Sequence, residues 1–335
     1  MLRHVLEVLD LLDSPTVDGP RTLAMLERVL SAPGASDPSA DTIRPALETT
    51  RVRGERGSTD FLSVTVPGLR GRTAGGDAPT LGIIGRLGGI GARPEVVGYV
   101  SDGDGAAAAL SAAVSLLRMW SRGDRLEGDV IVSTHVCPDA PTLPHDPVPF
   151  MDSPVDIATM NRHEVRPEMD AVISIDTTKG NRLINHRGIA LSPPVRQGYI
   201  LPLPDDLLRI QEIVTGGPAV TFPLTTQDIT PYGNGLRHIN SILQPATATD
   251  APVVGLAITS AAVVPGSASG ASHEVDIALA ARFAVEVAKE FGSGTAVLHD
   301  SAEFERVREI YGSLTHLQAV DGVRTAPALE TVEVH

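Results

Sequence analysis

Four short apolar runs decide the fold of this chain: residues 80–85 (TLGIIG), 129–134 (DVIVST), 170–175 (DAVISI) and 252–259 (PVVGLAIT). Each is a continuous run of the kind that forms a strand buried on both faces. Residues 106–117 and 275–291 carry apolar side chains at helical spacing. Strands that alternate with helices predict an α/β protein. We expect a mainly parallel or mixed central sheet with helices on both faces, a three-layer sandwich.

We predict a single α/β domain over residues 1–335, with no internal repeat. Residues 1–33 form an expected helical hairpin, because the first helix places its leucines on one face and a turn at residues 14–19 follows. Residues 31–41 are rich in Pro, Ser and Asp and predict a loop. Short strands are expected within residues 43–67. Residues 292–335 are expected to hold a last helix, near residues 302–314, and a tail.

The bulk composition excludes some functions. The formal net charge of −14 repels phosphate backbones, so we expect no nucleic-acid partner. The single cysteine, Cys137, cannot form an intrachain disulfide, which fits a reducing compartment. The first residues carry acids within their apolar run, and no stretch approaches the length of a membrane span. We therefore expect a cytoplasmic protein with no membrane partner.

Polar side chains follow the apolar runs at the edge where α/β proteins bind ligands. The candidates come from four segments: Asp102 and Asp104 before a helix, His135, Cys137 and Asp139 after the second run, Asp176, Thr177, Thr178, Lys179 and Asn181 after the third, and His273 after the fourth. Carboxylate, imidazole and thiolate are the ligands of zinc-like ions. We therefore predict a divalent metal, zinc by its ligand types, held by Asp102, Cys137, Asp176 and His273. His135, Asp139, Asp104 and Lys179 are the predicted catalytic residues.

Structural alternatives stand beside these assignments. Asp102 or Asp104 could cap the following helix, and Cys137 could be a small buried apolar residue. Long polar loops add four further candidates, His145, His186, Asp228 and His238. The predicted substrate-binding residues are Thr177, Thr178, Asn181, His186, Asp228 and His238. Residues 85–91 (GRLGGIG) are rich in glycine but lack the GxGxxG spacing of dinucleotide-binding loops, so we do not predict a dinucleotide site there.

Two family resemblances follow from the motifs. The stretches SIDTTKGNRLINHRGIA, PLTTQDITPYGNGLRHIN and GASHEVDIALAARF resemble a bacterial family known only as a domain of unknown function. More distantly, Asp102 before its helix, Asp176 after ISI and His273 after PVVGLAIT resemble metal ligands of the co-catalytic di-zinc aminopeptidases of the glutamyl and tetrahedral type. That resemblance implies an aminopeptidase-like fold with a small-molecule substrate and, because those peptidases assemble, a possible homo-oligomer. The span from Arg86 to Asp102 is too short for the family's inserted β-domain, so we expect that domain to be absent.

The chain departs from the aminopeptidase pattern at two motifs. Arg86 and Gly88 stand where the resemblance implies a ligand His and an Asp, and Val136 and Cys137 stand where it implies adjacent glutamates. Three hypotheses therefore remain. The first is a metal-dependent hydrolase of a small amide, peptide or amino-acid derivative. The second is a non-metal enzyme that uses Cys137, His135, Lys179 and His186. The third is a non-catalytic small-molecule binding protein.

Overall fold

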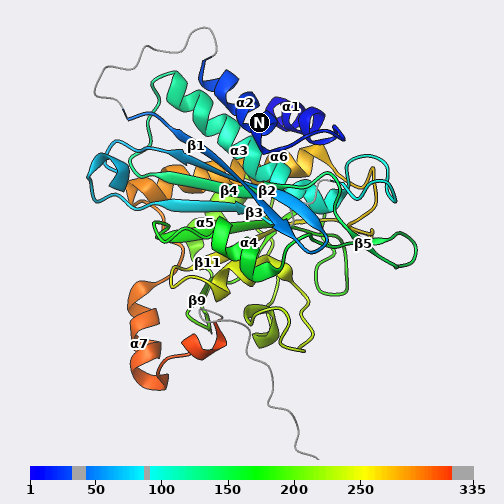
Figure 1. Cartoon of the computed structure of the whole chain (residues 1–335). Helices are drawn as coiled ribbons and strands as arrows, with labels where there is room; N and C mark the ends of the chain where they lie inside the picture. The colour runs from blue at the N-terminus through cyan, green and yellow to red at the C-terminus, as the bar shows by residue number, and fades with distance from the viewer. Residues whose placement is uncertain (32–42, 87–90, 319–335) are drawn as a thin grey trace, which may run out of the picture.

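A nine-stranded mixed sheet forms the centre of the computed structural model, which describes residues 1–31, 43–86 and 91–318 (Figure 1). The main strands are β1 (Ala46–Gly54), β2 (Gly57–Val66), β3 (Leu81–Gly85), β4 (Val130–Val136), β7 (Ala171–Thr178) and β11 (Val253–Thr259). They lie in the order β1-β2-β4-β3-β7-β11. Neighbours among β4, β3, β7 and β11 run parallel, whereas β2 runs antiparallel to both β1 and β4. The predicted fold class is therefore confirmed.

Short elements extend the sheet beyond β11. β9 (Val195–Arg196) and β10 (Tyr199–Ile200) continue its order, and β8 (Gly188–Leu191) pairs with the end of β11. A separate small ribbon joins β5 (Thr142–Leu143) and β6 (Phe150–Met151).

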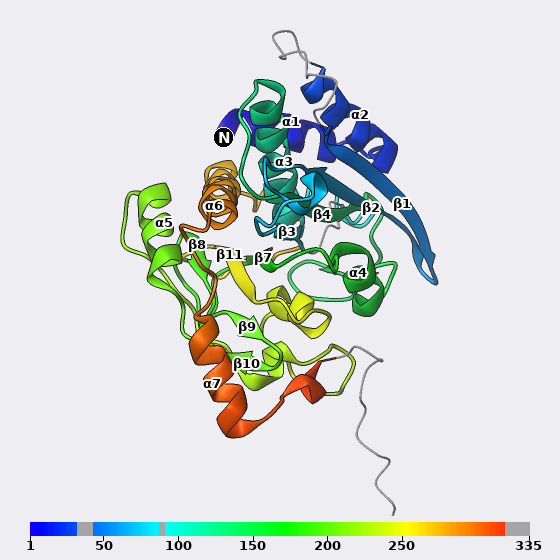
Figure 2. The ribbon, with the colours of Figure 1, turned by 90° about the vertical axis from the view of Figure 1, so that its left-hand side faces the viewer.

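Helices cover both faces of the sheet, as Figures 1 and 2 show. One face carries α1 (Leu2–Leu12), α2 (Gly19–Leu30), α3 (Asp104–Ser121) and α6 (Glu274–Ser293). This side holds the larger apolar core, built mostly from Ala, Val, Leu and Ile. The opposite face carries α4 (Ile157–Glu164) and the 3₁₀ helix η4 (Ser241–Thr247), over a smaller apolar cluster. The layered arrangement leaves the carboxyl ends of the parallel strands free to receive loops.

The remaining helices lie at the side of the sheet. α5 (Asp205–Thr215) packs against α6, and α7 (Ser301–Tyr311) follows α6 in the chain (Figure 2). Four single 3₁₀ turns complete the described elements: η1 (Arg72–Ala74), η2 (Ser101–Gly103), η3 (Thr226–Ile229) and η5 (Thr315–Leu317). Over the described ranges, no helix has both the length and the apolar character needed to cross a membrane.

Helices occur within both predicted terminal segments. α1 and α2 lie within the residues of the predicted hairpin and each packs on α3, and Asp18 caps α2 by accepting a hydrogen bond from the Arg21 backbone N–H. The last predicted helix is α7. Most of the predicted loop at residues 31–41, the tail after residue 318 and the predicted departure at Gly88 lie outside the described residues.

Candidate functional site

Three buried aspartates and one lysine gather at the carboxyl edge of the sheet, and we call Asp102, Asp104, Asp176 and Lys179 the acidic group. Asp102 lies on η2, Asp104 begins α3, and Asp176 lies near the end of β7. The Thr177 hydroxyl donates a hydrogen bond of 2.7 Å to the Ser101 carbonyl, so η2 directly contacts the end of β7. The strand-end rule predicts this convergence.

Asp104 is the member of the acidic group that pairs with the lysine. Its carboxylate lies 3.3 Å from Lys179 Nζ, and both side chains are almost completely buried. The Ser272 hydroxyl, which precedes α6, donates a hydrogen bond to its second oxygen. Asp104 therefore has a cation on one oxygen and a hydroxyl on the other, and it ties the starts of α3 and α6 to the end of β7.

Asp102 and Asp176 have no such cation. Asp102 accepts a hydrogen bond of 3.1 Å from the Ser267 hydroxyl. Asp176 accepts one of 2.5 Å from the Ser241 hydroxyl of η4 and one of 2.7 Å from the Thr177 backbone N–H. Neither carboxylate forms an ion pair with any residue in the part of the chain that the structure describes. Two buried acids thus lack a direct positive partner, which is costly if both are ionised.

Burial changes the acidity of all three carboxyl groups. It raises the pKa of Asp102 to about 6, although Ser267 and the charge of Lys179 act in the opposite direction. It raises the pKa of Asp104 to about 7 against the opposing effect of Lys179. Burial also raises the pKa of Asp176 to about 7, against the opposing effects of its hydrogen bonds and of the charge of Arg86, and the charge of Asp102 adds a little to the rise. Carboxyl groups with such values can exchange protons near neutral pH.

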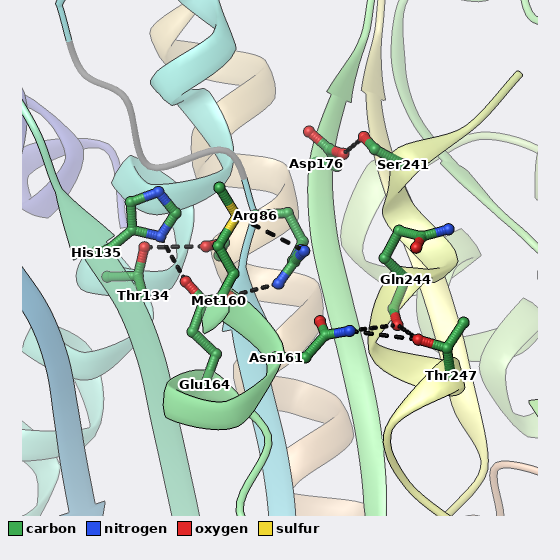
Figure 3. Close-up of polar contacts among 11 residues, drawn as sticks. Arg86, Thr134, His135, Met160, Asn161, Glu164, Asp176, Ser241, Gln244 and Thr247 are labelled. Carbon is green, nitrogen blue, oxygen red and sulfur yellow. Dashed lines mark hydrogen bonds and ion pairs between the residues drawn. The ribbon is translucent and has the colours of Figure 1, made fainter. Parts of the chain in front are cut away.

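A second polar network lies beside Asp176 on the face covered by α4 (Figure 3). Arg86 Nη1 donates a hydrogen bond of 2.5 Å to one oxygen of Glu164, and His135 Nδ1 lies 2.5 Å from the other. Arg86 and Glu164 are fully buried. Burial alone would raise the pKa of Glu164, but the charges of Arg86 and His135 lower it. The network therefore holds α4 on the sheet through an ionised glutamate.

The strand register explains why this network adjoins the acidic group. Gly85 pairs with Ile175 across β3 and β7, so the next residue, Arg86, lies beside Asp176. Parallel pairing of β3 with β4 brings His135 to the other side of Arg86 in the same way. Side chains on neighbouring strands at one level share a face. His135, Arg86 and Asp176 thus form one polar row under α4 and η4.

The predicted metal ligands Cys137 and His273 do not join the acidic group. Cys137 is buried with Ala92, Val100 and other apolar side chains, and burial raises the pKa of its thiol to about 12. His273 is 43% exposed at the start of α6, where its Nδ1 lies 3.9 Å from an Asp276 oxygen. A protonated, apolar-packed thiol is a poor ligand and a poor nucleophile.

The other predicted residues divide into three kinds. Asp139 is exposed and lines a cavity near β2, and Thr177 and Thr178 lie at the end of β7 next to the acidic group. Asn181 and Asp228 stabilise loops. The Asn181 side chain accepts hydrogen bonds from the backbone N–H groups of Leu183 and Ile184. Asp228 is buried, caps η3 and accepts hydrogen bonds from the backbone N–H groups of residues 239 and 240. The predicted histidines remain apart: His145 faces the Val148 carbonyl, His186 is exposed, and His238 packs against Tyr232.

Sequence reasoning missed several residues that shape the site. Glu164 lies on a helix away from any strand end, so nothing in its neighbourhood marks it. Ser241, Ser267 and Ser272 lie in loops whose path depends on the whole fold. Arg86 follows an apolar strand directly, and that position could have indicated a role at the carboxyl edge.

The residues present fit a divalent cation only in part. Across the described ranges, no three His, Cys, Asp or Glu side chains are arranged to hold a metal ion, so the four predicted ligands are not brought together. Asp102 and Asp176 nevertheless offer two buried carboxylates without a cationic partner. Oxygen donors of this kind suit a hard divalent cation whose remaining ligands are water or substrate, and not a closed zinc site with thiolate and imidazole.

Comparison with known proteins gives a family and a set of distant structural likenesses, of which two are described here. No curated protein sequence matches the chain. Cytosol aminopeptidase from Coxiella burnetii matches with 13% identity and a TM-score of 0.45, over 82% of this chain and 67% of the other. A point mutant of tomato leucine aminopeptidase matches with 12% identity and a TM-score of 0.46, over 85% of this chain and 60% of the other. The family model for the protein of unknown function DUF1177 matches residues 50–321, so the chain belongs to the DUF1177 family.

Proposed function

We propose that the chain is a metal-dependent hydrolase of a small amide, peptide or amino-acid derivative, with the acidic group as its active site. One observation carries the proposal: Asp102 and Asp176 are both buried at the carboxyl edge, near enough for the charge of Asp102 to act on Asp176, and neither has an ion-pair partner in the described residues. A cation bound between two such acids would offset the cost of burying their charges. It would also polarise a carbonyl group and lower the pKa of a bound water.

The chain's own residues supply the remaining functions. Asp102 and Asp176 would hold the cation, and Ser267 and Ser241 would orient them through the hydrogen bonds described above. Asp104, with a pKa of about 7, is the member best placed to exchange a proton near neutral pH. Lys179 balances its charge at 3.3 Å. His135 is a weaker candidate than the sequence predicts, because Glu164 engages its ring and the side chain is buried.

The identity of the cation is part of the proposal. The donors are carboxylate oxygens, which magnesium and manganese accept as readily as zinc does. We infer a divalent metal, with zinc as one candidate among the three. A cytoplasmic location remains a prediction from composition, and a small-molecule substrate is part of the hydrolase proposal.

The Cys137 enzyme hypothesis loses support from the geometry. The thiol donates a hydrogen bond of 3.5 Å to the Ser58 carbonyl, and burial favours its neutral form. No charged partner that would lower its pKa contacts it within the described ranges, since the charges of Asp139 and Asp60 act to raise the pKa.

A paired measurement of metal binding and turnover tests the proposal. Purified protein is depleted of metal, reloaded with magnesium, manganese or zinc, and assayed on a panel of dipeptides and aminoacyl amides. We expect turnover that depends on one metal and is lost in Asp102→Asn and Asp176→Asn. Asp124→Asn, an exposed aspartate in the turn after α3, is the matched control and should keep full activity. Metal binding without any turnover would instead favour the non-catalytic binding protein.

A further inference from the structure

A cavity of about 400 Å³ opens at the other end of the carboxyl edge, away from the acidic group. It lies between the α1–α2 turn, the start of β2 and the end of β4. None of its lining residues belongs to the acidic group or to the Arg86 network. A volume of this order suits a small organic ligand.

The inner wall of the cavity carries a fixed positive group. Arg51 donates to both oxygens of Asp60, with distances of 2.6 Å from Nε and 2.8 Å from Nη2. Asp60 is 3% exposed and also accepts a hydrogen bond of 2.7 Å from the Gly19 backbone N–H. These three bonds hold the guanidinium in place, and the charge of Asp18 also acts on it. Arg51 itself is exposed to the cavity, and its remaining N–H groups can meet an anion.

The outer wall carries negative groups. Asp18, the cap of α2, uses one oxygen for the Arg21 backbone N–H. Asp139, just past β4, is exposed, and its side chain accepts no hydrogen bond from the described residues. Pro15 and Pro138 supply the apolar surface of the cavity. The cavity therefore presents a guanidinium, two available carboxylates and an apolar floor.

We propose that this cavity binds a zwitterion, an α-amino acid or a short peptide with free ends. The ligand carboxylate meets Arg51, its ammonium group meets Asp139 and Asp18, and its body covers the apolar floor. A ligand of a single charge would satisfy one wall and bring like charges together at the other. The site is independent of the proposed hydrolase centre, because the two share no residue.

Binding of alanyl-alanine tests the proposal directly. Backbone amide NMR shifts are followed in the Asp176→Asn protein, so that hydrolysis does not consume the ligand. We expect shifts at Val17, Ser58 and Asp139 that saturate with alanyl-alanine. N-acetyl-alanyl-alanine, which lacks the ammonium group, and alanyl-alanine amide, which lacks the carboxylate, should each bind up to about fivefold more weakly, as expected for one exposed charge pair.

Two substitutions locate the site. Asp139→Asn should weaken alanyl-alanine binding about fivefold, and Ser58→Trp should abolish it by filling the cavity. Asp18→Asn keeps a good helix cap and serves as a second test if either variant fails to fold. Asp124→Asn should bind as the parent does. Equal binding of the capped peptides, or shifts confined to residues 101–104 and 176–179, would overturn the proposal without touching the hydrolase assignment.

Discussion

Replacing Glu164 by Gln removes the only negative charge that contacts Arg86 in the described structure, and it nearly preserves side-chain shape. Arg86 and Glu164 are both fully buried and 2.5 Å apart. Breaking a buried pair from one side leaves an uncompensated charge, which costs about 3–5 kcal/mol. The hydrogen bond to His135 is also weakened. We therefore expect the free energy of unfolding to fall by about 4 kcal/mol.

Urea unfolding, followed by far-UV circular dichroism at neutral pH, measures that change. Glu286→Gln is the matched control, because its pair with Lys289 lies on the exposed side of α6, and its cost should stay below about 1 kcal/mol. The double variant Arg86→Met/Glu164→Leu removes both charges and should recover much of the lost stability. A loss below about 1 kcal/mol for Glu164→Gln would refute the idea that this ion pair fixes α4 on the sheet.

Three further predictions concern the acidic group and its surroundings. Folding raises the pKa of Asp176 from 3.8 to about 7, so the contribution of this group to stability is present at low pH and is lost as the pH rises through 7. With a chelator present to remove metal, the free energy of unfolding of the wild type relative to Asp176→Asn should fall by about 4 kcal/mol between about pH 4 and pH 8. Thermal unfolding across pH checks this, and a constant difference would contradict it. Gly266→Ala should abolish metal binding in a calorimetric titration, because its Cβ would lie 2.0 Å from Asp102 Oδ1, whereas Gly217→Ala, with open space around it, should bind normally. Cys137 should resist iodoacetamide in the folded protein, as followed by mass spectrometry, because burial raises its pKa to about 12; rapid labelling would show that the thiol is accessible.

The central strands could be predicted from the sequence because each is a continuous apolar run. Residues 80–85 and 252–259 match β3 and β11 within one residue at each end. β4 and β7 begin within one residue of their predicted starts but extend two and three residues further, β4 through His135 and Val136 and β7 through three polar residues. The runs end where hydrophobicity ends, whereas strands end where backbone pairing ends.

Other elements escaped the sequence analysis for different reasons. α5 has an amphipathic pattern with Pro204 before it and Gly216 in a left-handed conformation after it, so its signals were readable and were missed. β8, β9 and β10 are two to four residues long, too short to show periodicity.

The candidate site was predictable only as far as strand topology determines it. Asp102, Asp104, Asp176 and Lys179 converge because they follow or face the ends of neighbouring parallel strands. Cys137 follows β4 equally closely, yet it turns into an apolar cluster with Ala92 and Val100. Proximity to a strand end thus sets the edge at which a residue lies but not the direction in which its side chain points.

Isothermal titration of the metal-depleted protein with manganese, zinc and magnesium tests the central claim most directly. If Asp102 and Asp176 hold a divalent cation, the wild type and Asp124→Asn will bind one equivalent of at least one of these metals, and Asp102→Asn and Asp176→Asn will each lose that binding while keeping the wild-type circular dichroism spectrum. Absence of binding to the wild type, or equal binding by all four proteins, would contradict the assignment of the acidic group as a metal-dependent active site.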